Sequence, residues 1–354
     1  MKIYIRSSAC ISAQKTFDSD GFLNDIVEYN STRLRAIEPD YKGFIDPKQI
    51  RRMSHVIKMS VAAAKRCLTS GNTDMPGAII TGTAFGCMED TVTFLTRIVE
   101  QQEELLPPTA FIQSTHNTVA AQIALMLQCH AYNSTFVHKG VSFEHALIDG
   151  MMMLKEQDAD TVLVGGTEEM VDTGFTILTR LGLYRRRPVS NLELYNTEAN
   201  GTIGGEGAGF FLLTGKPSTD NQAELAAVNI FYKPKNTTDI EKRINSFLKA
   251  QSLTINDIDI IITGKNGDVK NDAIYKELSQ SLFNNVPTAN YKHFSGDFSV
   301  APAFALWLAA NMIKRAEVPA AVTEGADRLP APKKILIYNH YQCNYHSLML
   351  VSAI

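Results

Sequence analysis

Apolar and polar positions recur along the chain with two periods, which predicts a succession of strands and helices. Short apolar or alternating runs indicate strands, and apolar positions at three- and four-residue steps indicate helices. By these signals the strands cover residues 3–11, 78–81, 161–164, 258–262 and 348–351, and the helices cover residues 51–68, 89–104 and 143–154. Within the helix at 89–104 we expect Val92, Leu95 and Val99 to face the interior. Strand–helix alternation of this kind is typical of an α/β protein.

An internal echo predicts that the α/β architecture consists of two similar halves. The segment Ile79-Ile80-Thr81-Gly82 and the segment Ile261-Ile262-Thr263-Gly264 have the same order of apolar residues, threonine and glycine. Asp90 and Asp272 follow the two glycines at the same spacing. Residues 216–222 are polar and contain a proline, which indicates a connection. We therefore expect an N-terminal half over residues 1–215 and a C-terminal half over residues 223–354.

Composition narrows the class of protein without identifying its chemistry. The chain has 354 residues, of which 45% are hydrophobic, and this is enough for a large core. A net charge of −3 gives no sign of a nucleic-acid or membrane partner. The five cysteines are scattered, with no CxxC pair, which favours a reducing cytoplasm and argues against a metal site. We expect a cytoplasmic protein, because the chain passes directly into a strand and has no bilayer-length apolar run.

The stretch from residue 135 to residue 170 resembles the β-ketoacyl synthases of the thiolase superfamily. That family begins a helix with C-x-S-x-x-H-A/N-I. The helix is followed by a strand with the pattern G-x-A-D, and the segment closes with G-G-x-E. Here the matching positions are Ser142, His145-Ala146-Leu147, Asp158-Ala159-Asp160, Gly165-Gly166 and Glu168. The segment 200–213, which contains Gly205-Glu206-Gly207, is similar to the family's glycine-rich G-E-G-A-G strand. The resemblance implies a thiolase-like five-layer αβαβα sandwich.

Three positions depart from the family's catalytic pattern. The family's cysteine nucleophile falls on Gly140, and its two histidines fall on Gly264 and Asp297. Glycine cannot form an acyl thioester or donate a hydrogen bond from a side chain. An ionised aspartate would repel the negative charge that develops during decarboxylation. The resemblance therefore predicts a chain without the Cys-His-His catalytic set.

Four other residues could still line a residual site. They are Ser142, His145, Lys292 and His293. We expect the Ser142 hydroxyl to cap the first turn of the helix that follows it. His293 has two readings, as a replacement base or as a surface or capping residue. The run Arg185-Arg186-Arg187 likewise has two readings, as a docking patch for an acyl carrier protein or as a solvated loop.

The C-terminal segment departs from the family as well. Ketosynthases end with a glycine-rich loop that gates the acyl tunnel, whereas residues 339–346 here read Asn-His-Tyr-Gln-Cys-Asn-Tyr-His. This argues against an ordinary gate. Cys343 lies near His340 and His346 in sequence, but alternate side chains on a strand point to opposite faces. We therefore predict no metal site there.

The function that the resemblance implies is that of a catalytically silent ketosynthase-like subunit. It would be similar to the chain-length factors of type II polyketide and aryl-polyene pathways, without a cofactor. Its expected partners are an active ketosynthase in a heterodimer, or a second copy in a homodimer, and an acyl carrier protein. Residues 107–127 are similar to the family's segment that reaches toward the dimer partner.

Two alternatives remain open at this point. The chain could be an acyltransferase or decarboxylase of the same family with relocated groups, using Ser142 or Cys87 as nucleophile and His293 as base. It could also be a stand-alone binding protein that retains an acyl pocket without chemistry.

Overall fold

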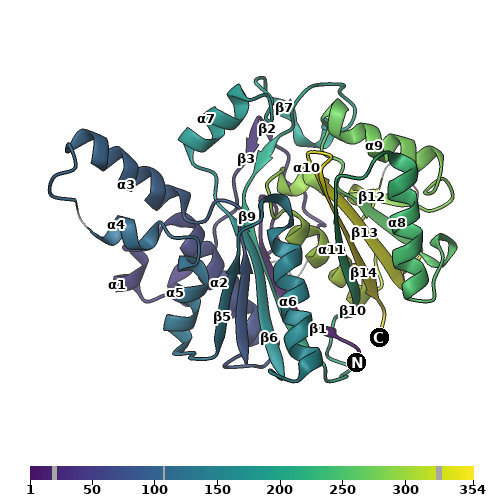
Figure 1. Ribbon diagram of the computed structural model, residues 1–354, viewed down its shortest axis with the longest axis horizontal. Coiled ribbons are helices and arrows are strands. Elements are labelled where there is room, and N and C mark those ends of the chain that lie inside the picture. The colour runs from purple at the N-terminus through teal and green to yellow at the C-terminus, as the bar shows by residue number, and fades with distance from the viewer. Residues whose placement is uncertain (18–21, 107, 324–328) are drawn as a thin grey trace.

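A mixed ten-stranded sheet runs through the whole molecule in the computed structural model, which describes residues 1–17, 22–106, 108–323 and 329–354 (Figure 1). The strands of its first half are β5 (Tyr132–Phe136), β4 (Ala78–Gly82), β6 (Thr161–Glu168), β9 (Gly207–Thr214) and β1 (Tyr4–Ile11). The strands of its second half are β12 (Thr288–Asn290), β11 (Ile260–Thr263), β13 (Lys334–Tyr341), β14 (Tyr345–Ser352) and β10 (Ala223–Tyr232).

The two halves of the sheet have the same order of strand directions. From each outer edge inward there are three parallel strands, followed by two antiparallel pairings. The halves join where β1 pairs with β10. The echoed segments at Ile79 and Ile261 lie on β4 and β11, which occupy equivalent places. Residues 215–222 connect β9 to β10, at the place where the sequence put the boundary between halves.

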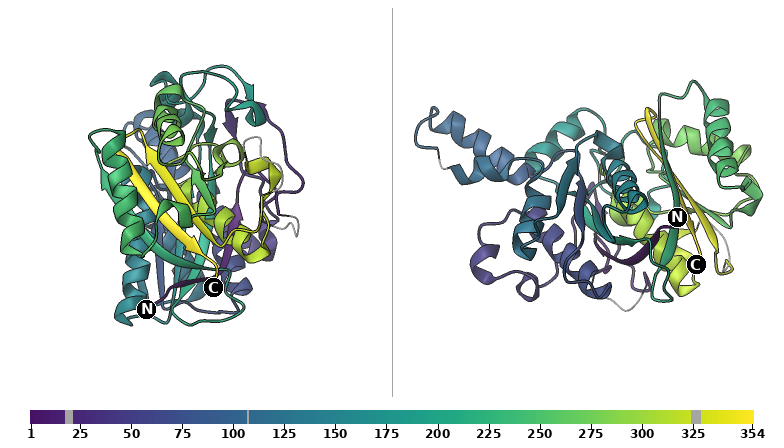
Figure 2. Two further views of the ribbon diagram at one scale, coloured as in Figure 1. Left: turned by 90° about the vertical axis from the view of Figure 1, so that its right-hand side faces the viewer. Right: turned by 60° about the horizontal axis from the view of Figure 1, so that its bottom comes forward.

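Helices cover both faces of each half and build the five layers (Figures 1 and 2). The outer helices of the first half are α2 (His55–Ser70) and α5 (Thr118–Leu127), and those of the second half are α8 (Thr237–Ala250) and α9 (Val269–Gln280). The central layer is α6 (Ser142–Glu156) and α11 (Pro302–Arg315), which contact strands of both halves. This is the thiolase-like αβαβα architecture that the sequence predicted.

Shorter elements surround these layers. They are the helices α1 (Pro47–Ile50), α3 (Met88–Glu100), α4 (Pro108–Gln113), α7 (Asp172–Arg180) and α10 (Lys292–Ser295), the pairs β2 (Asn30–Ser31) with β7 (Val189–Ser190) and β3 (Arg33–Leu34) with β8 (Gly204–Gly205), and the 3-10 turns η1 (Tyr41–Gly43), η2 (Lys139–Val141), η3 (Asn191–Glu193), η4 (Ile255–Asp257) and η5 (Ala320–Val322). Pro107, the first residue of the segment predicted to reach toward a partner, lies outside the described residues.

Several predicted details were wrong. The strand predicted to end at residue 164 is longer, because β6 continues through Gly165 and Gly166 to Glu168. These glycines allow close packing: a Cβ atom on Gly165 would lie 2.2 Å from the Phe210 ring. Two residues of α3 that were predicted to face inward are exposed, Leu95 by 55% and Val99 by 78%.

Candidate functional site

A cavity of about 210 Å³ lies where strand ends of the two halves meet beneath α7. Its apolar wall comes from α7 and the start of α3. Its polar wall comes from the end of β6, from loops at residues 266–271 and 297–299, and from the β13–β14 hairpin. Carboxyl ends of strands are where α/β proteins usually place their ligand sites, and the three family positions also lie in this region.

The side-chain space at Gly140 is filled by a neighbouring residue. Gly140 lies in η2, directly before α6. A Cβ atom on Gly140 would stand 2.3 Å from both Cβ and Cγ of Tyr341, the last residue of β13. Contacts of that length are too short for any real side chain, so a residue larger than glycine requires Tyr341 to move. Tyr341 also lines the cavity.

Gly264 shows the same kind of replacement at the second family position. A Cβ atom there would lie 2.1 Å from Asn339 Oδ1 and 2.6 Å from the Tyr275 hydroxyl. Hydrogen bonds hold both filling groups in place. The Tyr291 hydroxyl donates to Asn339 Oδ1 (3.3 Å), and the His340 N–H donates to the Tyr275 oxygen (3.1 Å). An imidazole at residue 264 would therefore displace a hydrogen-bonded pair of side chains.

Asp297, at the third family position, is ion-paired. Its Oδ1 atom lies 2.8 Å from Lys292 Nζ, and its Oδ2 atom accepts a hydrogen bond from Asn266 Nδ2 (2.9 Å). Lys292 is only 4% exposed. The sequence did not predict this pairing, in which a buried cation lies beside the Asp297 carboxylate.

Glu144 extends this charged group into the interior, and the sequence gave no signal for it. Its Oε1 atom accepts a hydrogen bond from Ser347 Oγ (2.7 Å), and its buried Oε2 atom has no hydrogen-bond partner. Burial raises the pKa of the Glu144 carboxyl to about 7, although the Ser347 hydrogen bond and the charge of Lys292 act in the opposite direction. A glutamate in the first turn of an amphipathic helix reads as a surface residue, so only the packed structure could show its burial.

Glu168 closes the end of β6 at the cavity. Its Oε1 atom accepts hydrogen bonds from the Thr83 hydroxyl (2.8 Å) and from the N–H groups of Ala84 and Phe85. Its Oε2 atom is buried and has no hydrogen-bond partner. Burial raises the pKa of the Glu168 carboxyl to about 7, against the effect of these donors.

The remaining predicted site residues lie away from the cavity lining. Ser142 is the first residue of α6 and does not cap it, because its hydroxyl donates back to the Lys139 carbonyl (2.8 Å). The His145 ring is 2.9 Å from the His138 ring and is stacked on Phe136.

His293 is buried and not at the surface. Its imidazole is bonded to the Tyr195 hydroxyl (3.2 Å) and the Ala321 carbonyl (3.0 Å), and burial lowers its pKa to about 4. Cys87 is also buried, which raises the pKa of its thiol. Neither residue is therefore placed or poised as the base or nucleophile that the alternative enzyme function would require.

The arginine run divides into two environments. Arg185 is buried, and its guanidinium donates to the carbonyls of Gly201 (3.2 Å) and Gly267 (2.8 Å) and to the Thr197 hydroxyl (2.7 Å). Arg185 therefore lies neither in a docking patch nor in a solvated loop. It links the loops that contain Gly201 and Gly267. Arg186 and Arg187 are exposed.

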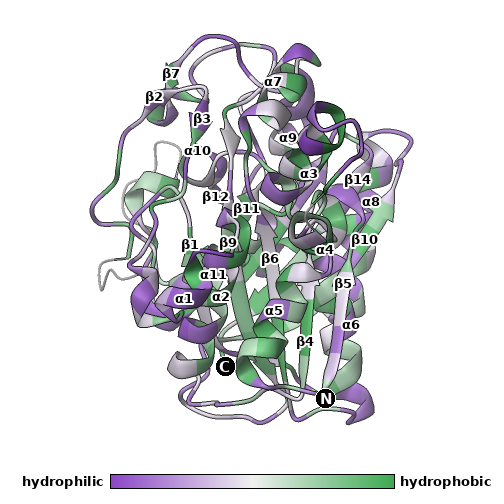
Figure 3. Cartoon of the chain, turned by 90° about the vertical axis from the view of Figure 1, so that its left-hand side faces the viewer, coloured by the Kyte–Doolittle hydropathy of each residue, from purple (hydrophilic) through white to green (hydrophobic). Residues whose placement is uncertain are grey.

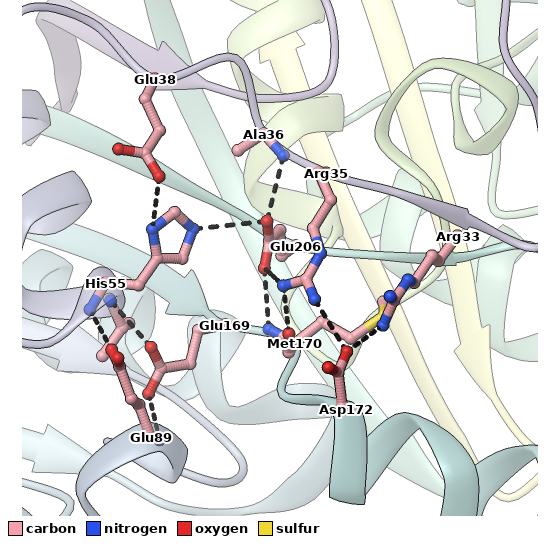
Figure 4. Close-up of polar contacts among 11 residues, drawn as sticks. Arg33, Arg35, Ala36, Glu38, His55, Glu89, Glu169, Met170, Asp172 and Glu206 are labelled. Atoms are coloured by element: carbon pink, nitrogen blue, oxygen red, sulfur yellow. Dashed lines mark hydrogen bonds and ion pairs between the residues drawn. The ribbon is translucent and has the colours of Figure 1, made fainter.

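A polar network behind the cavity wall was also missed (Figure 4). Glu206 accepts hydrogen bonds from the N–H groups of Ala36 (3.1 Å) and Met170 (2.9 Å), and it lies 3.3 Å from His55 Nε2. Burial opposes ionisation of both side chains, but their mutual contact lowers the pKa of Glu206 and, with the charge of Glu38, raises the pKa of His55. The network connects α2 and the segment that follows β3 to the residues at the end of β6, and so it fixes one wall of the cavity.

The described parts of the chain contain no cluster of three or more metal-ligating side chains and no helix of membrane-spanning character. There, no group of three or more His, Cys, Asp or Glu side chains is arranged to hold a metal ion. The rings of His340 and His346 lie 5.5 Å apart, but their nitrogens bond elsewhere: His346 Nδ1 bonds the Tyr338 hydroxyl, and His340 Nδ1 accepts from the Cys343 backbone N–H. None of the described helices combines the length and apolar character needed to span a bilayer.

Part of the chain is similar to a known protein family. Residues 31–183 match the family model described as "Beta-ketoacyl synthase, N-terminal domain". The matched segment covers less than half of the chain. A curated relative, the 3-oxoacyl-[acyl-carrier-protein] synthase 2 of Rhizobium meliloti (strain 1021), is 22% identical over 182 residues. That match spans 48% of this chain and 43% of the relative.

Solved β-ketoacyl synthase structures share the whole fold. The ishigamide ketosynthase/chain length factor has a TM-score of 0.81 at 16% identity, and the match covers 100% of this chain and 99% of that one. The ketosynthase ApeO in complex with its chain length factor ApeC, from Xenorhabdus doucetiae, has a TM-score of 0.80 at 16% identity, with 100% and 98% covered. At such low identity these likenesses concern the fold alone.

Proposed function

We propose that this protein is a ketosynthase-like subunit that pairs with an active β-ketoacyl synthase and acts as its chain-length factor. The observation that carries the proposal is the Tyr341 side chain, which occupies the space a nucleophile at residue 140 would need. Condensation in this family begins with acylation of that nucleophile, so a filled space favours a supporting role over a catalytic one.

The side of the molecule formed by α3, α4, α5 and β5 supports pairing (Figure 3). α3 and α4 project from the body (Figure 2), and they leave apolar side chains exposed, among them Val99, Phe111 and Ile112. β5 is the outermost strand of the sheet, so its outer edge is available to a partner strand. An apolar patch beside an open sheet edge is typical of a dimer interface.

The proposed subunit would complete the partner's acyl tunnel and limit the length of the growing chain. Acyl groups in such a system travel on an acyl carrier protein, which the name of the curated relative includes. We place contact with the carrier protein on the assembled heterodimer.

Co-expression with an intact ketosynthase encoded beside this chain tests the proposal. We expect both chains to elute together, with the mass of a one-to-one heterodimer, in size-exclusion chromatography with light scattering. A stable homodimer that ignores the ketosynthase would contradict the proposal. Intact mass after incubation with an acyl thioester should show no adduct on this chain, and a stoichiometric adduct would favour the relocated-enzyme alternative.

A further inference from the structure

Two histidines near the carboxyl end of β5 form a pair that the proposed function does not use. His138 lies in the loop between β5 and η2, and His145 lies in the first turn of α6. Nδ1 of His138 is 2.9 Å from Nε2 of His145. His138 is exposed and His145 is half-buried, so a small ligand can reach the pair from solvent. The sequence had named His145 as a candidate site residue, but it gave no sign of the partner.

Neighbouring side chains hold the two rings in place. The His145 ring is stacked on Phe136, with ring centroids 6.0 Å apart and an interplanar angle of 12°. The His138 ring is stacked on the His145 ring (4.9 Å, 20°) and makes an edge contact with Tyr345, the first residue of β14 (5.4 Å, 77°). The His138 backbone N–H donates to Ser142 Oγ (2.7 Å). A ligand of the pair would therefore have little side-chain freedom to remove on binding.

The separation of the two nitrogens matches that of two imidazole ligands on one metal ion. Metal–nitrogen bonds of about 2.0–2.1 Å place neighbouring ligand nitrogens about 2.9–3.4 Å apart, for bond angles from about 90° to the tetrahedral angle. The observed separation of 2.9 Å lies within this range. A metal ion would replace the proton that the two nitrogens share. Each neutral ring would then carry its proton on the other nitrogen, which requires a change of tautomer and a rotation of the exposed His138 ring.

The chemistry of the pair selects the kind of ion. Imidazole nitrogen is a ligand that suits Zn²⁺, Ni²⁺ and Cu²⁺. Partial burial and the neighbouring His138 lower the pKa of the His145 imidazole, so this ring has a lone pair to offer at neutral pH. We propose that His138 and His145 bind one divalent transition-metal ion of this class, with water in the other coordination positions.

Two protein ligands set the character of the site. The described residues supply no third metal-ligating side chain to this pair. Structural zinc sites have four protein ligands, so the proposed site is an open one from which the ion can exchange. The inference stands apart from pairing with a ketosynthase, because both ligands belong to a single chain.

Isothermal titration calorimetry of the full chain, without an affinity tag, with ZnCl2 and with NiCl2 at pH 7.5 tests the inference. We expect one ion to bind per chain. His138→Ala should weaken binding at least about tenfold, because even the loss of a group that only orients a metal ligand costs about 10–100-fold. His130→Ala, which removes an exposed histidine outside the pair, is the matched control and should bind like the wild type.

The dependence on pH separates this pair from carboxylates on the surface. Between pH 7.5 and pH 5.5 the affinity should fall at least about tenfold, because protons compete for imidazole nitrogens in this range, whereas exposed carboxylates stay ionised. His145→Ala removes a stacked ring and can disturb the fold, but His138→Ala changes only an exposed one and keeps the test decisive. Electron paramagnetic resonance of the Cu²⁺ complex should show nitrogen ligands that are lost in His138→Ala.

Three results would overturn the inference. They are no binding of either ion at millimolar concentration, equal affinities in His138→Ala and His130→Ala, and an affinity that does not change between pH 7.5 and pH 5.5. None of these results bears on the heterodimer measurement.

Discussion

At the residue scale, the Tyr341 side chain packs directly against Gly140, so each residue limits which side chains the other position can hold. The ring of Tyr341 stands where a side chain at residue 140 would project. The sequence predicts that Gly140 stands at the family's cysteine position, but it cannot show that another residue fills the space beside it. The same holds for Gly264, whose place is taken by Asn339 and Tyr275.

Gly140→Ala should lower the free energy of unfolding by about 1–3 kcal/mol, because the new methyl group overlaps the Tyr341 ring. In a Tyr341→Ala background the same substitution should cost less than about 1 kcal/mol, since the obstacle is gone. Urea denaturation of the four proteins in this double-mutant cycle measures the coupling. Gly43→Ala, at a glycine with nothing within 4 Å of an added Cβ, is the control and should be nearly neutral. If the two substitutions change the free energy of unfolding additively, Tyr341 and Gly140 do not pack against each other.

Glu144 makes the stability of the protein depend on pH in a direction that can be derived. Its folded pKa of about 7 lies above the ordinary 4.5, so folding favours the protonated carboxyl. This contribution is fully present below about pH 4.5 and is lost as the pH rises through about 7.

Glu144→Gln stays neutral at every pH and can still accept the Ser347 hydrogen bond. Between pH 4.5 and pH 8 the variant should therefore gain about 3 kcal/mol in stability relative to the wild type. Urea denaturation across this range measures the difference. Glu156→Gln, at the exposed end of the same helix, should follow the wild-type profile. Parallel profiles for Glu144→Gln and the wild type would show that Glu144 does not carry the effect.

At the element scale, α3 shows the limit of periodicity. Its apolar stripe predicted a helix correctly, but the stripe was assigned to the interior, whereas Leu95 and Val99 are exposed. A helix that faces a core and a helix that faces a partner need the same spacing of apolar residues. The C-terminal segment also differs from its sequence pattern, which suggested a loop over residues 339–346. Residues 339–341 belong to β13, and the turn is confined to residues 342–344.

Leu95→Glu should weaken pairing with the co-expressed ketosynthase by at least about tenfold while leaving the fold unchanged, because a charge would be buried in an apolar interface. Lys242→Glu, on the exposed face of α8 on the other side of the molecule, should pair normally. The measurement is the fraction of co-purified ketosynthase as the complex is diluted. If Leu95→Glu pairs as well as the control, α3 is not part of the interface.

At the scale of the whole molecule, the two halves share one core. A single cluster of buried residues includes Val164 and Phe211 from the first half, Ile262 and Ile337 from the second, and most of α11 between them. The sequence predicted two halves with a boundary at residues 216–222. The shared core argues against independent stability of either predicted half.

Unfolding should therefore occur in one transition. Trp307 lies on α11, with its ring 5.8 Å from that of Phe22 and 5.4 Å from that of Phe304, so its fluorescence reports on the central layer. We expect its fluorescence and the far-ultraviolet circular dichroism to give the same urea midpoint. Two separated midpoints would indicate that the halves unfold independently.

The sequence by itself determined the α/β class and the thiolase-like layers, and it predicts a two-fold repeat and the absence of the family's three reactive side chains. These features are encoded in local periodicity and in motif spacing, which survive without knowledge of contacts. It also located Glu168 and the Gly205-Glu206-Gly207 strand, although not what they bond to.

Only the tertiary structure decided which side chains surround the three predicted family positions. The contact of Tyr341 with Gly140, the ion pair of Lys292 with Asp297 and the burial of Glu144 and His293 join residues that are distant in sequence or change side-chain exposure without a local signal. Hydrogen-bond partners and the burial of a side chain depend on which elements pack against each other, and this is set by the tertiary fold. The unpaired oxygen of Glu168 and the exposed stripe of α3 also depend on how elements pack. Both are therefore seen in the tertiary structure and not in the sequence.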